Sequence, residues 1–232
     1  PDPLDAEAML EAELREQLWG DAEFLYERDF HRLRETKQAL YAGPVAVRLG
    51  EFECLRPGLV DKARIRNRHP VHRRSYLDFK LRLADHLLSD HGDRMAYGNS
   101  VEARYPFLDV GVIEYVKTLP PGLMLKNATE KYLLRRLAAR HLPAPVLDRE
   151  KFSFVAPGSP FMVRQNVDWV NELLAPETIR RQGYFNPATI ERLRQMYAAD
   201  GFQVNQTFDV DLLMIVLTFG LFLREFRMPD RA

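Results

Sequence analysis

The 232-residue sequence lacks several features that would each define a class of protein. It has a single cysteine, Cys54, which excludes an internal disulfide and a cysteine-based metal cage. Lys plus Arg and Asp plus Glu both total 33, so the formal net charge is zero. This balance argues against a dedicated nucleic-acid or anionic-membrane binder, because such binding depends on clustered positive charge. Residues 1–20 are acidic and amphipathic, unlike a signal peptide, so we expect a reducing, cytoplasmic setting.

Common nucleotide and hydrolase motifs are also missing. No stretch matches GxxxxGK[ST], GxGxxG or GxSxG, which excludes the most familiar phosphate loops and the nucleophile elbow. The apolar run LLMIVLTFGLFL is shorter than the ~20 residues that span a bilayer, so we expect a buried core helix there. The chain begins with Pro1 instead of Met, from which we expect a processed or truncated piece, or one part of something larger.

Helical periodicity dominates what is present, so we predict a mainly α fold with little sheet. Gly20 is expected to end the first helix, Asp109 to cap one helix, and Asn127 to cap another with Glu130 in a capping box. Residues 43–70 are rich in Gly and Pro and predict a loop with a short strand at VAVRL. The predicted helices cover residues 5–19, 21–42, 71–90, 107–119, 127–143, 160–174, 187–199 and 207–228.

The stretch SVEARYPFLD at 100–109 places Glu102 and Arg104 on one side of a short extended run. Apolar residues alternate with this pair, and Pro106 stops the pattern. Two interpretations are open at this point: the pair is a structural brace, or it is part of a catalytic wall.

Two lysines stand out by their positions. Lys131 is expected near a helix N-terminus, where the helix dipole disfavours a cation but attracts an anion that could share the site. Lys151 lies in DREKFSF, on a loop from which it could reach into a cleft. The alternative for both is an ordinary solvated lysine.

Acids and histidines offer weaker candidates. Asp90 and Asp93 are expected at the C-terminal end of a long helix, where a carboxylate is disfavoured unless a cation or a substrate amine pairs with it. The alternative is local pairing with Arg94. We expect no metal site, because Pro70 prevents regular helical ligand spacing between His69 and His72.

A family resemblance appears at GDRMAYGNSVEARYPFLD, which resembles the asparagine synthetase pattern DRMSMAHSxEvRxPFLD in the C-terminal synthetase domain. The sequence departs from that pattern at 96–99, and the following LPPGLMLKNATEKYLLRRLAARHLPAPVLDREKFSF resembles LPxxLKL…KyiLRxa…LPxxvlxRpKxgF. The agreement covers about 90–155, with a looser likeness over 160–228, so we divide the chain into 1–69, which we do not align, and 70–232. The matching residues of the first motif are Asp93, Arg94, Met95, Ser100, Glu102, Arg104, Pro106, Phe107, Leu108 and Asp109.

The resemblance implies the C-terminal helical half of an adenine-nucleotide α-hydrolase-like (PP-loop) synthetase domain. It implies an enzyme that uses ATP and Mg²⁺ to adenylate a substrate carboxylate, releases pyrophosphate and lets an amine form an amide. Two family lysines that stabilise the phosphates correspond to Lys131 and Lys151. Asp90 lies near a glutamate that assists the amine in ring-closing relatives.

For the motif at 100–109, the resemblance favours a supporting role. Glu102 and Arg104 would brace the site as an ion pair, and Asp109 would cap the next helix.

Three family elements are missing from the sequence: the SGGxDS loop, the GxGxDE segment and the glutaminase domain with its leading cysteine. We therefore expect a partner chain that carries the ATP loop, a glutaminase as a second candidate partner, and little activity of this chain alone. Two alternatives stay open, a β-lactam- or macrolactam-forming cyclase subunit and a non-catalytic scaffold. The acyl substrate and the amine donor are left undetermined.

Overall fold

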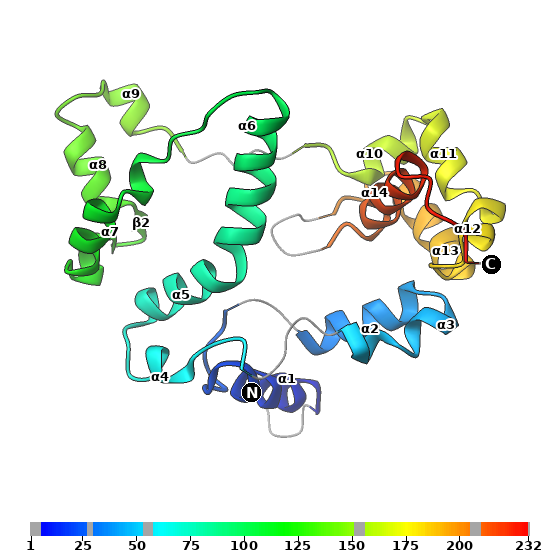
Figure 1. Cartoon of the computed structure of the whole chain (residues 1–232), viewed down its shortest axis with the longest axis horizontal. Helices are drawn as coiled ribbons and strands as arrows, with labels where there is room; N and C mark the ends of the chain where they lie inside the picture. Colours follow the sequence, from blue (N-terminus) through cyan, green and yellow to red (C-terminus); the bar gives the residue numbers. More distant parts are fainter. Residues whose placement is uncertain (1–5, 27–29, 53–57, 151–155, 205–209, 232) are drawn as a thin grey trace. The chain divides into compact units, whose positions relative to one another are not determined.

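The computed structural model describes residues 6–26, 30–52, 58–150, 156–204 and 210–231. These residues are mainly helical (Figure 1), and their strands are β1 (Leu125–Lys126) and β2 (Thr129–Glu130), which pair antiparallel. The prediction of a mainly α fold with little sheet is therefore confirmed.

The chain forms two compact units that interleave in sequence. The first unit combines residues 1–28 with 55–151, and the second combines 29–54 with 152–232. The division at residue 70 expected above concerned alignment with a family, and it stays a prediction.

The first unit has a small core around α1 (Ala6–Trp19). Gly20 ends this helix with φ of +75°, a conformation that glycine adopts without steric cost, so the predicted end is confirmed. Lys62 of α4 (Lys62–Ile65) donates to the Glu16 carbonyl at 2.9 Å. The buried apolar residues of this core are Leu14, Leu18, Trp19, Tyr26, Val60, Ile65 and Leu77.

The predicted helix over 21–42 is wrong in its first part, because α2 spans only Phe30–Leu40. The Asp21 carboxylate accepts from the Glu23 backbone at 2.9 Å and from Arg73 at 2.5 Å, and Trp19 Nε1 donates to the Phe24 carbonyl at 3.2 Å. These bonds give residues 21–26 a turn that competes with the helix. Burial is the largest single influence on the pKa of Asp21 and raises it, but the hydrogen bonds from Arg73 and the nearby backbone, with the charge of Arg73, together lower the pKa below its ordinary value.

The predicted strand at 45–49 is also wrong. Residues there form two short helices, α3 (Gly43–Ala46) and η1 (Leu49–Phe52). Pro44 at the start of α3 has the fixed φ that suits a first helical turn.

The predicted helix over 71–90 is present and longer than expected. It runs through α5 (Pro70–Asp78), the π-helical η2 (Phe79–Asp93) and α6 (Arg94–Gly98). Along this helical stretch Leu77 is fully buried, whereas Leu81 and Leu88 are only half-buried. A π-helix repeats at a wider interval than an α-helix, so residues spaced for an α-helix no longer share one face.

In the second unit, α2 and the described helices after residue 156 pack around a larger core. In place of a single helix over 160–174 the chain forms α10 (Ser159–Arg164) and α11 (Asp168–Leu174), separated by Asn166 with φ of +52°. The others are α12 (Pro176–Gln182), α13 (Pro187–Ala198) and α14 (Leu212–Glu225). The buried core residues are Leu40, Val170, Leu173, Leu174, Ile179, Phe185, Ile190, Leu193, Tyr197, Leu213, Val216 and Leu217.

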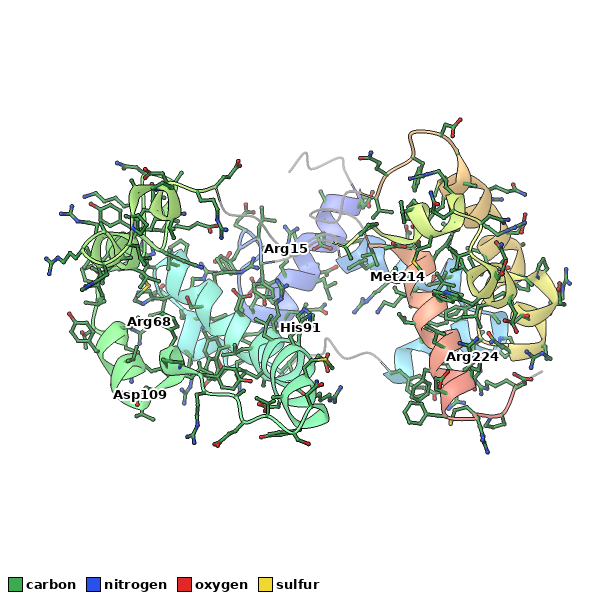
Figure 2. All side chains as sticks on the ribbon, turned by 90° about the horizontal axis from the view of Figure 1, so that it is seen from above. Arg15, Arg68, His91, Asp109, Met214 and Arg224 are labelled. Atoms are coloured by element: carbon green, nitrogen blue, oxygen red, sulfur yellow. The ribbon has the colours of Figure 1, made fainter. Side chains whose placement is uncertain are left out.

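α14 is the core helix expected from the apolar run, and Figure 2 labels Met214 near its start and Arg224 near its end. Asp211 caps it by accepting from the Met214 backbone at 3.0 Å. The same carboxylate accepts from the backbone nitrogen of Ser159 at 2.7 Å and from its hydroxyl at 2.5 Å, which joins α10 to the start of α14. No helix in the described part of the chain is long and apolar enough to cross a membrane.

Candidate functional site

The segment 99–117 of the first unit turns, extends and then re-enters a helix. After α6 it reverses at Ser100, with φ of +56°, and runs extended to η3 (Pro106–Leu108) and α7 (Val110–Lys117). Asp109 stands at the start of α7 (Figure 2) and accepts from the Val112 backbone at 3.2 Å. The predicted Asp109 cap is therefore confirmed.

Glu102 and Arg104 form an ion pair with an N–O distance of 2.8 Å. Their side chains are 71% and 81% exposed, respectively. A pair this exposed contributes at most about 1 kcal/mol to stability, because water screens its charges. The pair therefore does not hold the described chain together, and its bracing role stays a prediction.

Tyr105 anchors the extended run against the end of η2. Its hydroxyl donates to the Asp93 carboxylate at 3.3 Å, and it lies over Gly92. Partial desolvation and then the negative charge of Asp93 raise the pKa of Tyr105. Asp93 therefore acts here as a local acceptor, a role that the sequence analysis did not anticipate.

Gly92→Ala is expected to destabilise this anchor by about 1–3 kcal/mol, because an added Cβ would lie 2.4 Å from Tyr105 Oη. Gly98→Ala is the matched control, since nothing lies within 4 Å of its added Cβ and alanine favours the helix by about 0.5–1 kcal/mol. Hydrogen exchange of the amides in 93–109 would measure both effects. Equal protection in the two variants would contradict the anchoring role of Tyr105.

Asp90 pairs with Arg94, with an N–O distance of 2.6 Å, inside one helical stretch. This is the local pairing considered above as the alternative to a substrate amine. Asp90 lies within η2, one turn before its end.

Lys131 lies at the start of α8 (Tyr132–Ala138), and the predicted capping box is wrong. Asn127 and Ala128 form the turn of the β1–β2 hairpin with φ of +48° and +59°, as type I′ turns require at both central positions. Asparagine tolerates this conformation better than most residues. Asn127 therefore lies in the hairpin turn and does not cap a helix. Lys131 itself is left-handed, with φ of +55°, and its side chain is exposed.

Arg135 fixes the hairpin, α8 and α9 (Ala144–Leu147) together. Its Nε donates to the Glu130 carbonyl at 3.3 Å, and its Nη1 donates to the Leu147 carbonyl at 2.5 Å. Sequence reasoning did not single out Arg135 or its neighbours Lys126, Tyr132 and Arg136. The i, i+4 spacing of Tyr132 and Arg136 was the one available signal.

The described members of the predicted site are not all joined to one another by hydrogen bonds or ion pairs. Lys151 lies outside the described residues. Among those described, no hydrogen bond or ion pair joins Lys131 to Asp90, Glu102 or Arg104.

Histidine and carboxylate side chains show no metal-binding arrangement in the described ranges, where no three or more His, Cys, Asp or Glu residues are placed to hold an ion. His69 instead caps α5, and its Nδ1 accepts from the Val71 backbone at 3.2 Å.

The segment 78–150 has many apolar residues but no core. None of its described side chains is buried. Single exposed apolar residues are ordinary, whereas a large contiguous set marks an interaction surface. The large apolar residues that are more than a third exposed between 95 and 146 are Met95, Tyr97, Val101, Tyr105, Phe107, Val110, Val112, Tyr115, Val116, Leu125, Leu133, Leu134, Leu137, Leu142 and Val146.

Comparison with known proteins gives consistent family matches. The family model described as asparagine synthase matches residues 2–222. Asparagine synthetase [glutamine-hydrolyzing] 1 of Bacillus subtilis is 32% identical over 108 residues, which cover 47% of this chain and 17% of the relative. A putative asparagine synthetase of Mycobacterium tuberculosis is 38% identical over 88 residues, 38% of this chain and 13% of the relative. Amidase chyE of Penicillium rubens is 34% identical over 95 residues, 38% of this chain and 14% of the relative.

The matched region is thus less than a fifth of the length of each of these relatives. No solved structure matches the chain.

Proposed function

The chain belongs to the asparagine synthase family, and we propose that it supplies the C-terminal helical half of a PP-loop synthetase domain that forms amide bonds with ATP. The observation that carries this proposal is the family match over residues 2–222, which includes both candidate lysines. In the proposed reaction a substrate carboxylate is adenylated, pyrophosphate leaves, and an amine attacks the acyl-adenylate to give an amide and AMP.

Lys131 and Lys151 are proposed to offset the negative charge that builds on the leaving pyrophosphate. A fixed cation stabilises such developing charge most when it is already positioned before the reaction. The left-handed backbone of Lys131 supports this role, because residues in rarely populated conformations concentrate at functional sites. Asp90 would assist the amine, and Glu102 and Arg104 would brace the site from outside the reacting atoms.

A partner that carries the SGGxDS loop is proposed to cover the exposed apolar side chains between 95 and 146. Burying apolar surface contributes about 25 cal/mol per Å², so covering this set would stabilise an assembly strongly. The complementary half of the nucleotide site would arrive with the same partner, in a cytoplasmic setting. The Mg²⁺ ion implied by the family finds no ligand set in the described residues, and no step of the proposal depends on it.

The test is to purify the native protein, with no tag on any partner chain. Mass spectrometry then identifies every chain that co-purifies with it. The assembled material is then assayed for ATP-dependent pyrophosphate release and amide formation across carboxylates and amines. We expect activity in the assembly and none in this chain alone. An active single chain would contradict the need for a partner.

Two other functions are distinguished by the same assay. Amide formation within one substrate molecule, without added amine, would favour a lactam-forming cyclase subunit. Failure of the full assembly to bind ATP or release pyrophosphate would refute the proposed enzyme and favour a scaffold.

A further inference from the structure

Three side chains meet on the β1–β2 hairpin and α8 in an arrangement that the proposed roles above do not use. Lys126 ends β1, Tyr132 begins α8, and Arg136 follows one turn later. Arg136 Nη1 donates to Tyr132 Oη at 3.2 Å. Lys126 Nζ and Arg136 Cζ lie 5.2 and 5.9 Å from the centre of the Tyr132 ring. Both distances are within the limit of about 6 Å for a cation–π contact.

This cluster, Lys126–Tyr132–Arg136, carries two positive charges, and no carboxylate of the described residues balances them. In the described part of the chain neither Lys126 nor Arg136 forms an ion pair with an acid. The hydrogen bond from Arg136 and then the charge of Lys126 lower the pKa of Tyr132, and every charged group that acts on this phenol is a cation. Two like charges held around one ring repel each other, and a bound anion would remove that cost.

The backbone holds the cluster in place from both sides. The hairpin register pairs Lys126 with Thr129, and the Arg135 guanidinium bonds to carbonyls of β2 and α9. Lys126, Tyr132 and Arg136 thus project from backbone segments that these hydrogen bonds hold together. The Tyr132 hydroxyl accepts a hydrogen bond from Arg136 and keeps its own proton to donate.

We infer that the Lys126–Tyr132–Arg136 cluster binds a multiply charged phosphate group, with pyrophosphate as the class of ligand. Two cations and one hydroxyl donor suit a dianionic or more highly charged group with several oxygens better than a singly charged carboxylate. The identity of the anion as the leaving pyrophosphate rests on the proposed function. The presence of the site rests on the cluster alone.

Titration calorimetry of the full chain with sodium pyrophosphate tests this inference, with sodium acetate as the carboxylate arm. Arg136→Gln and Lys126→Gln are each expected to weaken pyrophosphate binding by about tenfold or more, the loss typical of one charge-assisted hydrogen bond. Arg140→Gln is the matched control, because it removes one exposed positive charge just beyond α8 and outside the cluster. Equal weakening in all three variants, or acetate binding as tight as pyrophosphate binding, would overturn the inference.

A spectroscopic readout guards against variants that simply fail to fold. Absorbance at the phenolate wavelength should rise in the wild type below the pH at which ordinary tyrosines ionise, and Tyr132→Phe should remove that early rise. Saturating pyrophosphate should delay it, because a nearby anion disfavours the phenolate and raises its pKa. An unchanged titration in the presence of pyrophosphate would contradict binding at this cluster.

The inference and the proposed function fail separately. Pyrophosphate binding that depends on the cluster, in an assembly that forms no amide, would leave the site standing and refute the function. Amide formation with pyrophosphate binding unaffected by Arg136→Gln and Lys126→Gln would refute the site and leave the function standing.

Discussion

Lys151→Ala is expected to lower amide formation by the assembled enzyme by ~100-fold to ~1,000-fold, the loss typical of removing one preorganised electrostatic stabiliser. Lys151 lies outside the described residues, so this prediction rests on the DREKFSF motif. Arg149, Lys151 and Phe154 match the spacing of the family's RpKxgF segment. Pyrophosphate release and amide yield, followed separately, would show whether adenylation or amide transfer suffers more.

Three comparisons make the Lys151 prediction specific. Lys151→Arg should rescue poorly, because a planar guanidinium does not replace a compact ammonium. Lys80→Ala is the control, since Lys80 is an exposed lysine of η2 with no assigned role. Melting temperatures should stay nearly equal if Lys151 serves the reaction and not the fold. Near-normal turnover of Lys151→Ala would refute the assignment, and a large loss of melting temperature would make the lysine structural.

Asp211→Ala is expected to destabilise the second unit by about 2.5 kcal/mol or more. Loss of the α14 cap accounts for about 0.5–2 kcal/mol. The rest comes from Ser159, which is fully buried and would keep a backbone N–H and a hydroxyl without their acceptor, at about 1–3 kcal/mol for each such group. At roughly 2–4 °C per kcal/mol for a chain of this size, the melting temperature should fall by roughly 5 °C or more.

Hydrogen exchange read by mass spectrometry would locate the Asp211 effect, because it reports local opening segment by segment. Protection should fall in α10 and α14 and stay unchanged in α1 and α5. Asp211→Asn should lose less, since its amide oxygen still accepts at the cap. Asp200→Ala removes an exposed carboxylate of the same unit and should change stability by less than about 0.5 kcal/mol. A loss as large in Asp200→Ala would contradict the role assigned to Asp211.

The sequence by itself determined the features that depend on a few neighbouring residues. The mainly α class, the end of α1 at Gly20 and the Asp109 cap of α7 follow from helical periodicity and local hydrogen bonding, which operate within one or two turns. Motif spacing around Glu102 and Arg104 likewise indicated the family that the match over 2–222 then showed. These inferences held because no distant partner competes for the residues concerned.

Tertiary structure decided the rest, wherever a residue had more than one local option. Asp21 could have begun a helix, but Arg73, 52 positions away, holds it in a turn. Asn127 could have capped a helix, but pairing of β1 with β2 places it in a hairpin and moves Lys131 to the first position before α8. The meeting of Lys126 with Tyr132 and Arg136 follows from that same pairing. Sequence patterns report the spacing of residues along one helix or strand, whereas such contacts depend on how separate elements pack.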